Sequence, residues 1–229
     1  MFSHHIYLTD TREITGEKQF EELLLLVPPQ RQEKVRGFRR ENDRKLSLCA
    51  GLLLQYGMKQ AGLPENAEIV LGEQGKPFFR SYPEVQFNLS HAGHTAVCVF
   101  SDRPVGVDYE IITCFDDKMA AYVFLPDEIE RIKQQAGGNS CDALYTRLWT
   151  VKESILKYLG VGLTYGPKRV HIGAGEELLG IRGFSSVPKL HLTVFETEEG
   201  ILSVCSELSP FPANPCPVQC EVLLSARKR

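Results

Sequence analysis

The chain has 229 residues, of which 43% are apolar and 24% are charged. This length suffices for one large domain or two small ones, and a formal net charge of −3 argues against a general nucleic-acid-binding protein. No apolar run approaches the roughly 20 residues of a membrane span, and the N-terminus lacks the basic flank and apolar core of a signal peptide. We therefore expect a cytoplasmic protein, with free cysteines, that binds neither nucleic acid nor a membrane.

The first half of the chain changes from helical to strand patterns. Leu46, Ala50, Leu53 and Gly57 recur at helical spacing, and a glycine and a proline follow them. From residue 68 onward the residue pattern predicts short strands separated by turns, and one of these turns is expected at residues 91–94. The expected order is a strand at 6–8, helices at 17–26, 31–38 and 41–58, and strands at 68–71, 85–90, 95–100 and 105–111.

The second half repeats this order, with helices first and strands later. Its longest predicted helix carries an apolar stripe of Leu144, Leu148, Val151, Ile155 and Leu159, and Gly160 ends it. The expected elements are helices at 115–124, 126–136 and 141–159, strands at 168–172, 190–195, 201–206 and 218–224, and a proline-rich loop at 209–217. The repeated order predicts an α+β fold of two lobes, residues 1–103 and 104–229, joined near residues 102–104.

Two carboxylates stand two residues apart in the predicted strand at 105–111. Side chains alternate along a strand, so Asp108 and Glu110 are expected on the same face. Two carboxylates on one face repel unless a cation lies between them, and oxygen ligands of this kind suit Mg²⁺. A solvated strand face is the alternative interpretation, and the pair alone does not exclude it.

A third carboxylate lies on the predicted helix at 141–159. Trp149, Glu153 and Lys157 are spaced four residues apart and therefore share a face of that helix, away from the apolar stripe. Glu153 is a candidate third metal ligand, with the cation Lys157 beside it. A surface Glu–Lys pair is the alternative.

Three further segments are candidates for holding a phosphate group. Ser90 and His91 end a predicted strand, and Lys76 lies in Gly75-Lys76-Pro77, which is not a Walker A loop. Arg31 and Lys34 belong to a basic helical stretch that also contains Arg36, Arg39 and Arg40. A turn histidine and a solvated helix face are the structural alternatives for the first and last of these segments.

The order of these segments resembles the 4′-phosphopantetheinyl transferase superfamily, and more narrowly its monomeric class that activates surfactin synthetase and similar peptide synthetases. The motifs that carry the resemblance are Gly-Lys-Pro, Phe-Asn-Leu-Ser-His, Gly-Val-Asp-x-Glu and Trp-x-x-Lys-Glu-Ser-x-x-Lys, which span Gly75 to Lys157. The resemblance implies a pseudo-dimer of two similar lobes with the active site at their interface. It also implies a monomeric enzyme.

The resemblance assigns roles to individual residues. Asp108, Glu110 and Glu153 would be the Mg²⁺ ligands, and Lys157 would contact the phosphates of coenzyme A. The remaining coenzyme A contacts would be made by Arg31, Lys34, Lys76, Ser90 and His91, with His91 at the 3′-phosphate. Family members usually carry an arginine where this chain has Leu46, and Arg44 or Lys45 are the candidates to replace it.

The implied reaction moves the phosphopantetheine arm of coenzyme A to a serine of an apo acyl or peptidyl carrier protein and releases adenosine 3′,5′-bisphosphate. Asp108, Glu153 and Lys157 would be the catalytic residues, with Glu153 or a metal-bound water as the general base. Apolar residues near 115–124, including Phe124, are expected to dock the carrier. A metal-dependent nuclease or phosphatase and a non-catalytic coenzyme-A-binding or carrier-binding module remain as alternatives.

Overall fold

The computed structural model describes residues 4–225 and divides the chain into two units that are each discontinuous in sequence. The first unit holds the chain up to Val70, Phe79–Asp102 and the chain from Ala213 onward, and the second holds Leu71–Phe78 and Arg103–Pro212. The main change of unit thus lies one residue before the predicted lobe boundary. The predicted boundary assigns residues 71–78 to the first lobe and the segment from 213 to the second. In the structure, residues 71–78 belong to the second unit and the segment from 213 belongs to the first.

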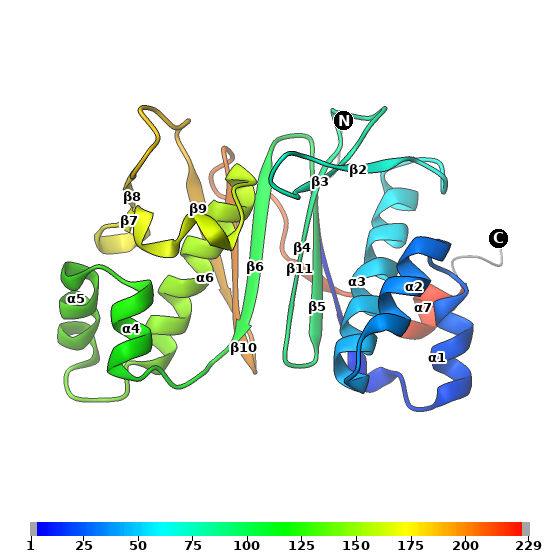
Figure 1. The fold of residues 1–229 in the computed structure, drawn as a ribbon, viewed down its shortest axis with the longest axis horizontal. Helices are drawn as coiled ribbons and strands as arrows, with labels where there is room; N and C mark the ends of the chain where they lie inside the picture. Colours follow the sequence, from blue (N-terminus) through cyan, green and yellow to red (C-terminus); the bar gives the residue numbers. More distant parts are fainter. Residues whose placement is uncertain (1–3, 226–229) are drawn as a thin grey trace. The chain divides into compact units, whose positions relative to one another are not determined.

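The first unit contains a four-stranded sheet in the order β11-β1-β5-β4, with its helices on one side of the sheet (Figure 1). β5 (Thr95–Ser101) is buried along most of its length and pairs antiparallel with β1 (His5–Asp10) and with β4 (Gln86–Ala92). β11 (Pro215–Pro217) pairs with β1 in parallel.

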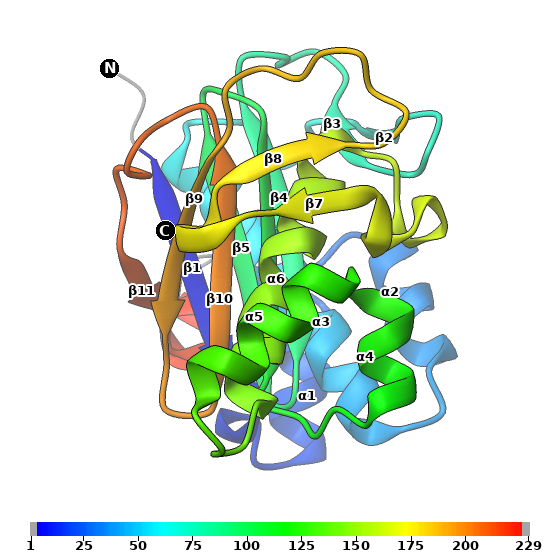
Figure 2. The same cartoon turned by 90° about the vertical axis from the view of Figure 1, so that its left-hand side faces the viewer.

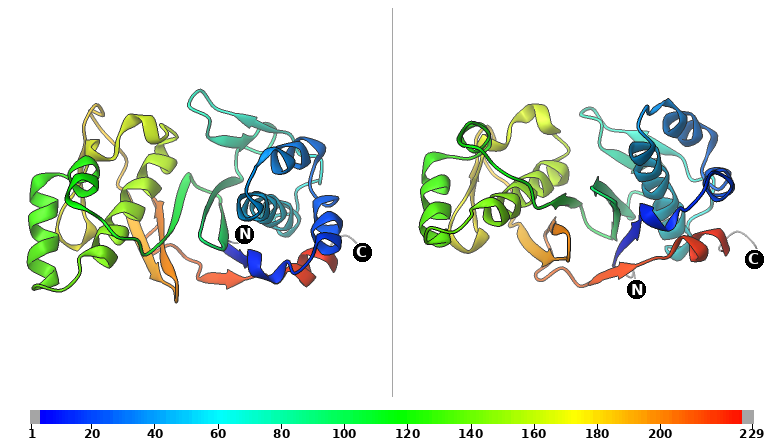
Figure 3. Two further views of the ribbon diagram at one scale, coloured as in Figure 1. Left: turned by 60° about the horizontal axis from the view of Figure 1, so that its bottom comes forward. Right: turned by 90° about the horizontal axis from the view of Figure 1, so that it is seen from below.

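Among the described residues, four α-helices belong to this unit, and the helical segments early in the chain are drawn in blue in Figure 3. The longest, α3 (Glu41–Gln60), packs on β5, where Gly57 makes room for the Phe100 ring: a Cβ atom at Gly57 would lie 2.0 Å from that ring. The helices are α1 (Glu17–Leu24), α2 (Pro29–Gly37), α3 (Glu41–Gln60) and α7 (Cys220–Ser225), with a 3₁₀ turn at Thr11–Glu13.

The second unit has a three-stranded antiparallel sheet in the order β6-β10-β9. These strands are β6 (Val105–Ile111), β9 (His191–Glu196) and β10 (Gly200–Ser206), and a separate antiparallel pair joins β7 (Val170–Ile172) to β8 (Leu178–Ile181) (Figure 2). The helices are α4 (Asp117–Val123), α5 (Pro126–Ala136) and α6 (Asp142–Leu159), with 3₁₀ turns at Leu163–Tyr165, Pro167–Arg169 and Ala174–Glu176. Both units therefore combine helices with a sheet in which most strand pairs are antiparallel, which confirms the predicted α+β class.

Most predicted elements are present, with ends that differ by a few residues. Three short strands were not predicted: β3 (Pro77–Phe79), which pairs with β2 (Ile69–Leu71), and both β8 and β11. The turn expected at residues 91–94 is shorter, because β4 continues to Ala92 and only Gly93 and His94 connect it to β5. No helix in the described range 4–225 is both long and apolar enough to cross a membrane.

The prediction of a strand at residues 218–224 is wrong, because most of this segment forms helix α7. The Cys220 N–H donates to Glu13 Oε2 at 2.7 Å, so an acidic side chain far away in sequence satisfies a free donor at the start of the helix. Val218 and Leu223 are buried in the core of the first unit. This tertiary environment overrides the strand propensity of an aliphatic segment. The strand of this region is instead β11, inside the predicted proline-rich loop, where an edge position tolerates prolines.

Candidate active site

Asp108 and Glu110 lie on β6, two positions apart and therefore on the same face of the strand. Asp108 is 3% exposed, and Ser203 of β10 is its cross-strand partner. Glu110 is half-buried near the end of the strand. The solvated strand face that was the alternative interpretation is excluded for Asp108, because a solvated side chain would not be buried.

Helix α6 lies directly against this face of β6. A Cβ atom at Gly106 would be 2.0 Å from the Ser154 carbonyl oxygen and 2.4 Å from the Tyr158 backbone nitrogen, so only a glycine permits the contact. A hydroxyl–hydroxyl hydrogen bond of 2.7 Å between Thr150 and Ser203, both fully buried, joins the same helix to β10. The backbones of helix and sheet are thus held at a fixed, short separation.

The second motif brings Glu153 and Lys157 to the carboxylates of β6. The Lys157 ammonium donates to Asp108 Oδ1 at 2.7 Å, in an ion pair whose aspartate side chain is 4% exposed. Glu153 is 4% exposed, and among the described residues its Oε1 atom is buried without a hydrogen-bond partner. This burial excludes the alternative interpretation of Glu153 as a surface side chain. A buried carboxylate oxygen without a hydrogen-bond partner also costs free energy.

The acidic residues perturb each other electrostatically. Burial, and then the charge of Asp108, raise the pKa of Glu153 to about 7, although Lys157 lowers it. Burial and the same aspartate raise the pKa of Glu110 to about 7, and a hydrogen bond from Trp149 opposes this shift. The fold therefore disfavours the negative charge of both glutamates near neutral pH.

This donor set fits a hard divalent cation in its chemistry. Three buried or half-buried carboxylates repel one another, and the cation that would offset the repulsion also suits their oxygen atoms. As the side chains stand in the described part of the chain, no three Asp, Glu, His or Cys residues converge closely enough to hold a metal ion. Instead, Lys157 supplies the positive charge beside Asp108.

Lys76 is held by the same unit rather than projecting into solvent. Its ammonium donates to the carbonyl oxygens of Val105, at 3.0 Å, and Tyr158, at 2.8 Å. Burial lowers its pKa to about 8. The lysine expected to reach a ligand therefore has two of its three N–H groups bonded to backbone.

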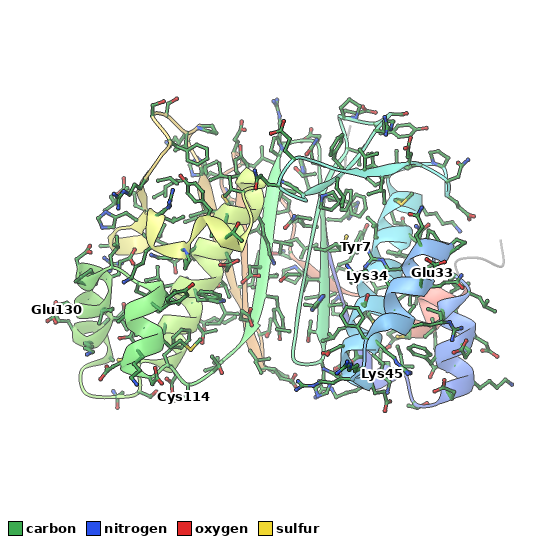
Figure 4. The ribbon with its side chains drawn as sticks, in the orientation of Figure 1. Tyr7, Glu33, Lys34, Lys45, Cys114 and Glu130 are labelled. Carbon is green, nitrogen blue, oxygen red and sulfur yellow. The ribbon has the colours of Figure 1, made fainter. Side chains whose placement is uncertain are left out.

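Arg31 and Lys34 form a pair of neighbouring cations on α2 of the first unit (Figure 4 labels Lys34). Burial lowers the pKa of Arg31, and burial together with the charge of Arg31 lowers that of Lys34. The aliphatic stem of Arg31 packs over Gly51 of α3, since a Cβ there would lie 3.0 Å from Arg31 Cγ. No acidic side chain is paired with either residue in the described range, so the pair favours a bound anion.

Ser90 and His91 lie in sequence on β4 of the first unit, so they point to opposite faces of the strand. Ser90 is 7% exposed, whereas His91 is exposed to solvent. The turn histidine of the alternative interpretation is wrong, because His91 belongs to the strand.

The position where the resemblance expects an arginine carries no charge, because Leu46 is buried at 5% exposure. Its neighbours already have partners. Lys45 donates to the Ile14 carbonyl at 3.0 Å and pairs with Glu41 at 2.8 Å. Arg44 donates to the Phe38 carbonyl at 3.3 Å.

The prediction that Phe124 docks the carrier is wrong, because its side chain is fully buried and stacks on Tyr145, with ring centroids 5.1 Å apart. The exposed apolar side chains of this region are Met119 and Tyr122 on α4, at 40% and 76% exposure. Helical spacing explains the difference, since the face of α4 that carries Ala120 and Val123 is the buried one.

Two sequence profiles of one family match consecutive parts of the chain. A profile described as the 4′-phosphopantetheinyl transferase superfamily matches residues 104–198, and one described as the N-terminal part of 4′-phosphopantetheinyl transferase matches residues 15–102. The chain belongs to the 4′-phosphopantetheinyl transferase superfamily. The predicted enzyme class, a 4′-phosphopantetheinyl transferase, is thereby confirmed.

Named relatives agree with this family. The chain is 24% identical to the 4′-phosphopantetheinyl transferase Sfp of Bacillus subtilis (strain 168), over 91% of this chain and 95% of the relative. It is 30% identical to the 4′-phosphopantetheinyl transferase psf-1 of Bacillus pumilus, over 66% of this chain and 65% of the relative. A further 4′-phosphopantetheinyl transferase of Bacillus subtilis is 29% identical over 62% of this chain, and that match spans 64% of the relative.

The division between the two phosphopantetheinyl transferase profiles falls beside the change of structural unit at Asp102 and Arg103. The carboxylate cluster, which consists of Asp108, Glu110 and Glu153, lies with Lys157 in the match to the superfamily profile. The N-terminal match contains Arg31, Lys34, Ser90 and His91. Two features of the site were not predicted. The first is the hydrogen bond between Thr150 and Ser203, which joins α6 to β10. The second is the pair of bonds from Lys76 to the backbone carbonyls of Val105 and Tyr158. These partners are distant in sequence and meet only in the folded chain.

Proposed function

We propose that this phosphopantetheinyl transferase moves the 4′-phosphopantetheine arm of coenzyme A to a serine of an apo acyl or peptidyl carrier protein, in a Mg²⁺-dependent reaction. The observation that carries the proposal is the cluster of Asp108, Glu110 and Glu153 beside Lys157, because buried carboxylates next to a lysine suit phosphoryl transfer with a divalent cation. The predictions of a monomer and of a cytoplasmic location stay part of this proposal.

In the proposed site, Asp108, Glu110 and Glu153 would hold the Mg²⁺ ion. Bound there, the ion would supply positive charge to the pyrophosphate of coenzyme A. Lys157 adds a second positive charge, and its bond to Asp108 fixes the ammonium in position. The ion would offset the repulsion between the buried Glu153, the half-buried Glu110 and Asp108.

The proposed reaction replaces the phosphoanhydride bond of coenzyme A by a phosphate ester bond to serine. The serine oxygen of the carrier forms a bond to the phosphorus next to the pantetheine arm, and the bond from this phosphorus to the bridging oxygen breaks. Adenosine 3′,5′-bisphosphate leaves with that oxygen, and the serine proton must be accepted. Glu153 is the proposed acceptor, because a carboxylate with a pKa of about 7 takes up a proton more readily than an ordinary glutamate.

We assign the nucleotide end of coenzyme A to the residues of the first unit. Arg31 and Lys34 are neighbouring cations without an acidic partner in the described range, and the 3′-phosphate is an anion that such a pair can bind. Ser90 and His91 are the further proposed phosphate contacts. The expected pseudo-dimer with an active site at the interface of its lobes belongs to this proposal.

The experiment that tests the function is mass spectrometry of several apo carrier proteins after incubation with the chain, coenzyme A and Mg²⁺. The expected result is a gain of one phosphopantetheine on a serine, together with one adenosine 3′,5′-bisphosphate per modified carrier. Release of the nucleotide without any carrier would instead indicate a phosphatase or nuclease. Coenzyme A binding without release of nucleotide would indicate a binding module.

The exposed side chains of α4 are the proposed contact for the carrier protein. Tyr122→Glu places a charge on a side chain that is 76% exposed, so we expect it to raise the KM for the carrier about tenfold while kcat stays within about twofold. Steady-state kinetics with a varied carrier concentration measures both constants. Leu179→Glu, at a 54% exposed position on β8, is the control. An unchanged KM in the Tyr122 variant would contradict the assignment.

A further inference from the structure

Lys76 joins three segments of the second unit through its side chain. The residue lies between Gly72 and β3, in a tight loop where the Gly72 N–H donates to the Lys76 carbonyl at 2.9 Å and the Gly75 N–H donates to the Gly72 carbonyl at 2.9 Å. From this loop the ammonium reaches the carbonyl oxygens of Val105 and Tyr158, at 3.0 and 2.8 Å. One lysine thus connects its own loop, the start of β6 and the end of α6.

The two carbonyl groups belong to the elements that carry the carboxylate cluster. Val105 is the first residue of β6, three positions before Asp108, and Tyr158 directly follows Lys157 near the end of α6. Because both oxygens bind the same nitrogen, their separation is limited to what that nitrogen can span. The distance between Lys157 and Asp108 depends on the same separation between α6 and β6.

The surroundings of Lys76 are built for this contact. Gly160, at φ +70°, ends α6, and a Cβ atom there would lie 3.3 Å from the Cβ and Cδ atoms of Lys76. The ammonium also lies 5.7 Å from the centre of the Tyr158 ring. The ammonium lies at the C-terminal end of α6, where the helix dipole offsets part of the cost of burying its charge.

We propose that Lys76 is a positioning residue, which holds β6 and α6 at the separation that the Asp108–Lys157 pair requires. It acts through the backbone carbonyl groups of Val105 and Tyr158, which occupy two of its three N–H groups. The inference rests on the proposed function for its effect on turnover, but its structural part concerns the free protein.

The structural part is tested by hydrogen exchange of the free protein, without Mg²⁺ or coenzyme A. Lys76→Met keeps the length of the side chain and removes both hydrogen bonds, and Lys189→Met, at an exposed position of the same unit, is the matched control. We expect about tenfold faster exchange for the amides of Gly72 and Gly75 and for those at the start of β6 in the Lys76 variant only. Unchanged exchange at these amides would overturn the proposal.

Two further variants make the result independent of one substitution. Lys76→Arg retains the charge and the donors, so we expect it to recover part of the protection that Lys76→Met loses. Lys76→Gln keeps one polar donor group on a shorter chain, and exchange between that of the wild type and of the methionine variant is expected. Equal protection in the wild type and in every folded Lys76 variant would contradict a positioning role.

Kinetics then separates a positioning residue from a phosphate ligand. A positioning role predicts that Lys76→Met lowers kcat about tenfold or more while the KM for coenzyme A changes less than threefold. A raised KM with normal kcat and unchanged hydrogen exchange would show a direct phosphate contact instead. If wild-type protein modifies no carrier, the proposed function fails, whereas the hydrogen-exchange result still decides the structural role of Lys76.

Discussion

At the scale of single residues, the site is defined by acidic side chains in an environment that disfavours their charge. Glu153 and Glu110 are raised in pKa by burial and by the nearby Asp108, and Lys157 offsets only part of this effect. Structural ion pairs also perturb pKa values, but a structural pair satisfies its atoms, whereas Glu153 Oε1 has no hydrogen-bond partner in the described range. The cluster is therefore incomplete by itself, which is typical of a binding or catalytic site.

Glu153→Gln is expected to lower carrier modification by at least about 100-fold, because the amide can neither accept the serine proton nor offer an anionic ligand. The variant should fold normally, since a neutral side chain removes repulsion within the cluster. Turnover and circular dichroism measure the two properties. Glu130→Gln, on the exposed surface of α5 (Figure 4), is the matched control. Near-normal turnover in the Glu153 variant would rule out its catalytic role.

The pKa of Lys76 predicts a dependence of stability on pH. The partly buried ammonium has a folded-state pKa of about 8, below its ordinary value of 10.5, so below pH 8 the folded protein bears the cost of a desolvated charge. Between about pH 8 and 10.5 the folded chain releases this proton first, and the cost disappears. The free energy of unfolding of wild type should therefore rise relative to that of Lys76→Met, by about 2 kcal/mol from pH 7.5 to pH 10.

Denaturant unfolding of both proteins at several pH values measures this difference, and it cancels groups that titrate in both chains. Lys189→Met should show a constant offset from wild type. A constant offset for Lys76→Met as well would show that its ammonium has an ordinary pKa in the folded state.

At the scale of elements, the contact between β6 and α6 decides the geometry of the site. Gly106 lies on the same strand face as Asp108 and Glu110, and it allows the helix backbone to approach. A buried polar network holds the other side of α6: the Lys152 ammonium donates to Glu128 Oε2 at 2.6 Å and to the Val170 carbonyl at 2.8 Å. Lys152 and Glu128 are both fully buried, and their charges compensate each other.

Gly106→Ala is expected to destabilise the protein by about 1–3 kcal/mol, because the new methyl group would meet the backbone of α6 at 2.0 Å and backbone cannot rotate away. It should also lower turnover, since α6 carries Glu153 and Lys157. Denaturant unfolding and carrier modification measure the two effects. Gly180→Ala, with no atom within 4 Å of the added Cβ, should have little effect. Equal stability of the two variants would show that α6 and β6 are not in tight contact.

At the scale of the whole molecule, the proposed ligand contacts are divided between two units. The first unit supplies cations without an acidic partner in the described range, Arg31 and Lys34, and the second supplies the carboxylate cluster. Coenzyme A has a phosphate at its nucleotide end and a pyrophosphate in its middle. If one coenzyme A molecule contacts both sets of residues, its binding must alter both units.

We expect coenzyme A with Mg²⁺ to slow hydrogen exchange in α2 and β4 of the first unit and in β6 and α6 of the second. At a concentration of 100 times the dissociation constant, the ligand should raise the free energy of unfolding by about 2.7 kcal/mol. Arg31→Gln should reduce the protection in both units together, because the proposed function has one ligand contact residues of both. Protection confined to one unit would contradict the proposed division of the ligand contacts.

The sequence alone determined which residues are candidates for the site and the general fold class. Local patterns are sufficient for this, because alternation puts Asp108 and Glu110 on one strand face and a spacing of four residues puts Glu153 and Lys157 on one helix face. The order of the motifs then indicated the family. The same local patterns located most helices and strands, since burial periodicity is a property of neighbouring residues.

Only the tertiary structure decided which interpretation of each pattern holds. Whether Glu153 is a surface side chain depends on the close approach of α6 to β6, which Gly106 permits and no local pattern reports. Whether residues 218–224 form a strand depends on Glu13, which caps α7 from the opposite end of the chain. The role of Lys76 depends on two carbonyl groups separated from it by 29 and 82 residues. Long-range contacts of this kind arise only when the chain is folded, because distant residues become neighbours only then.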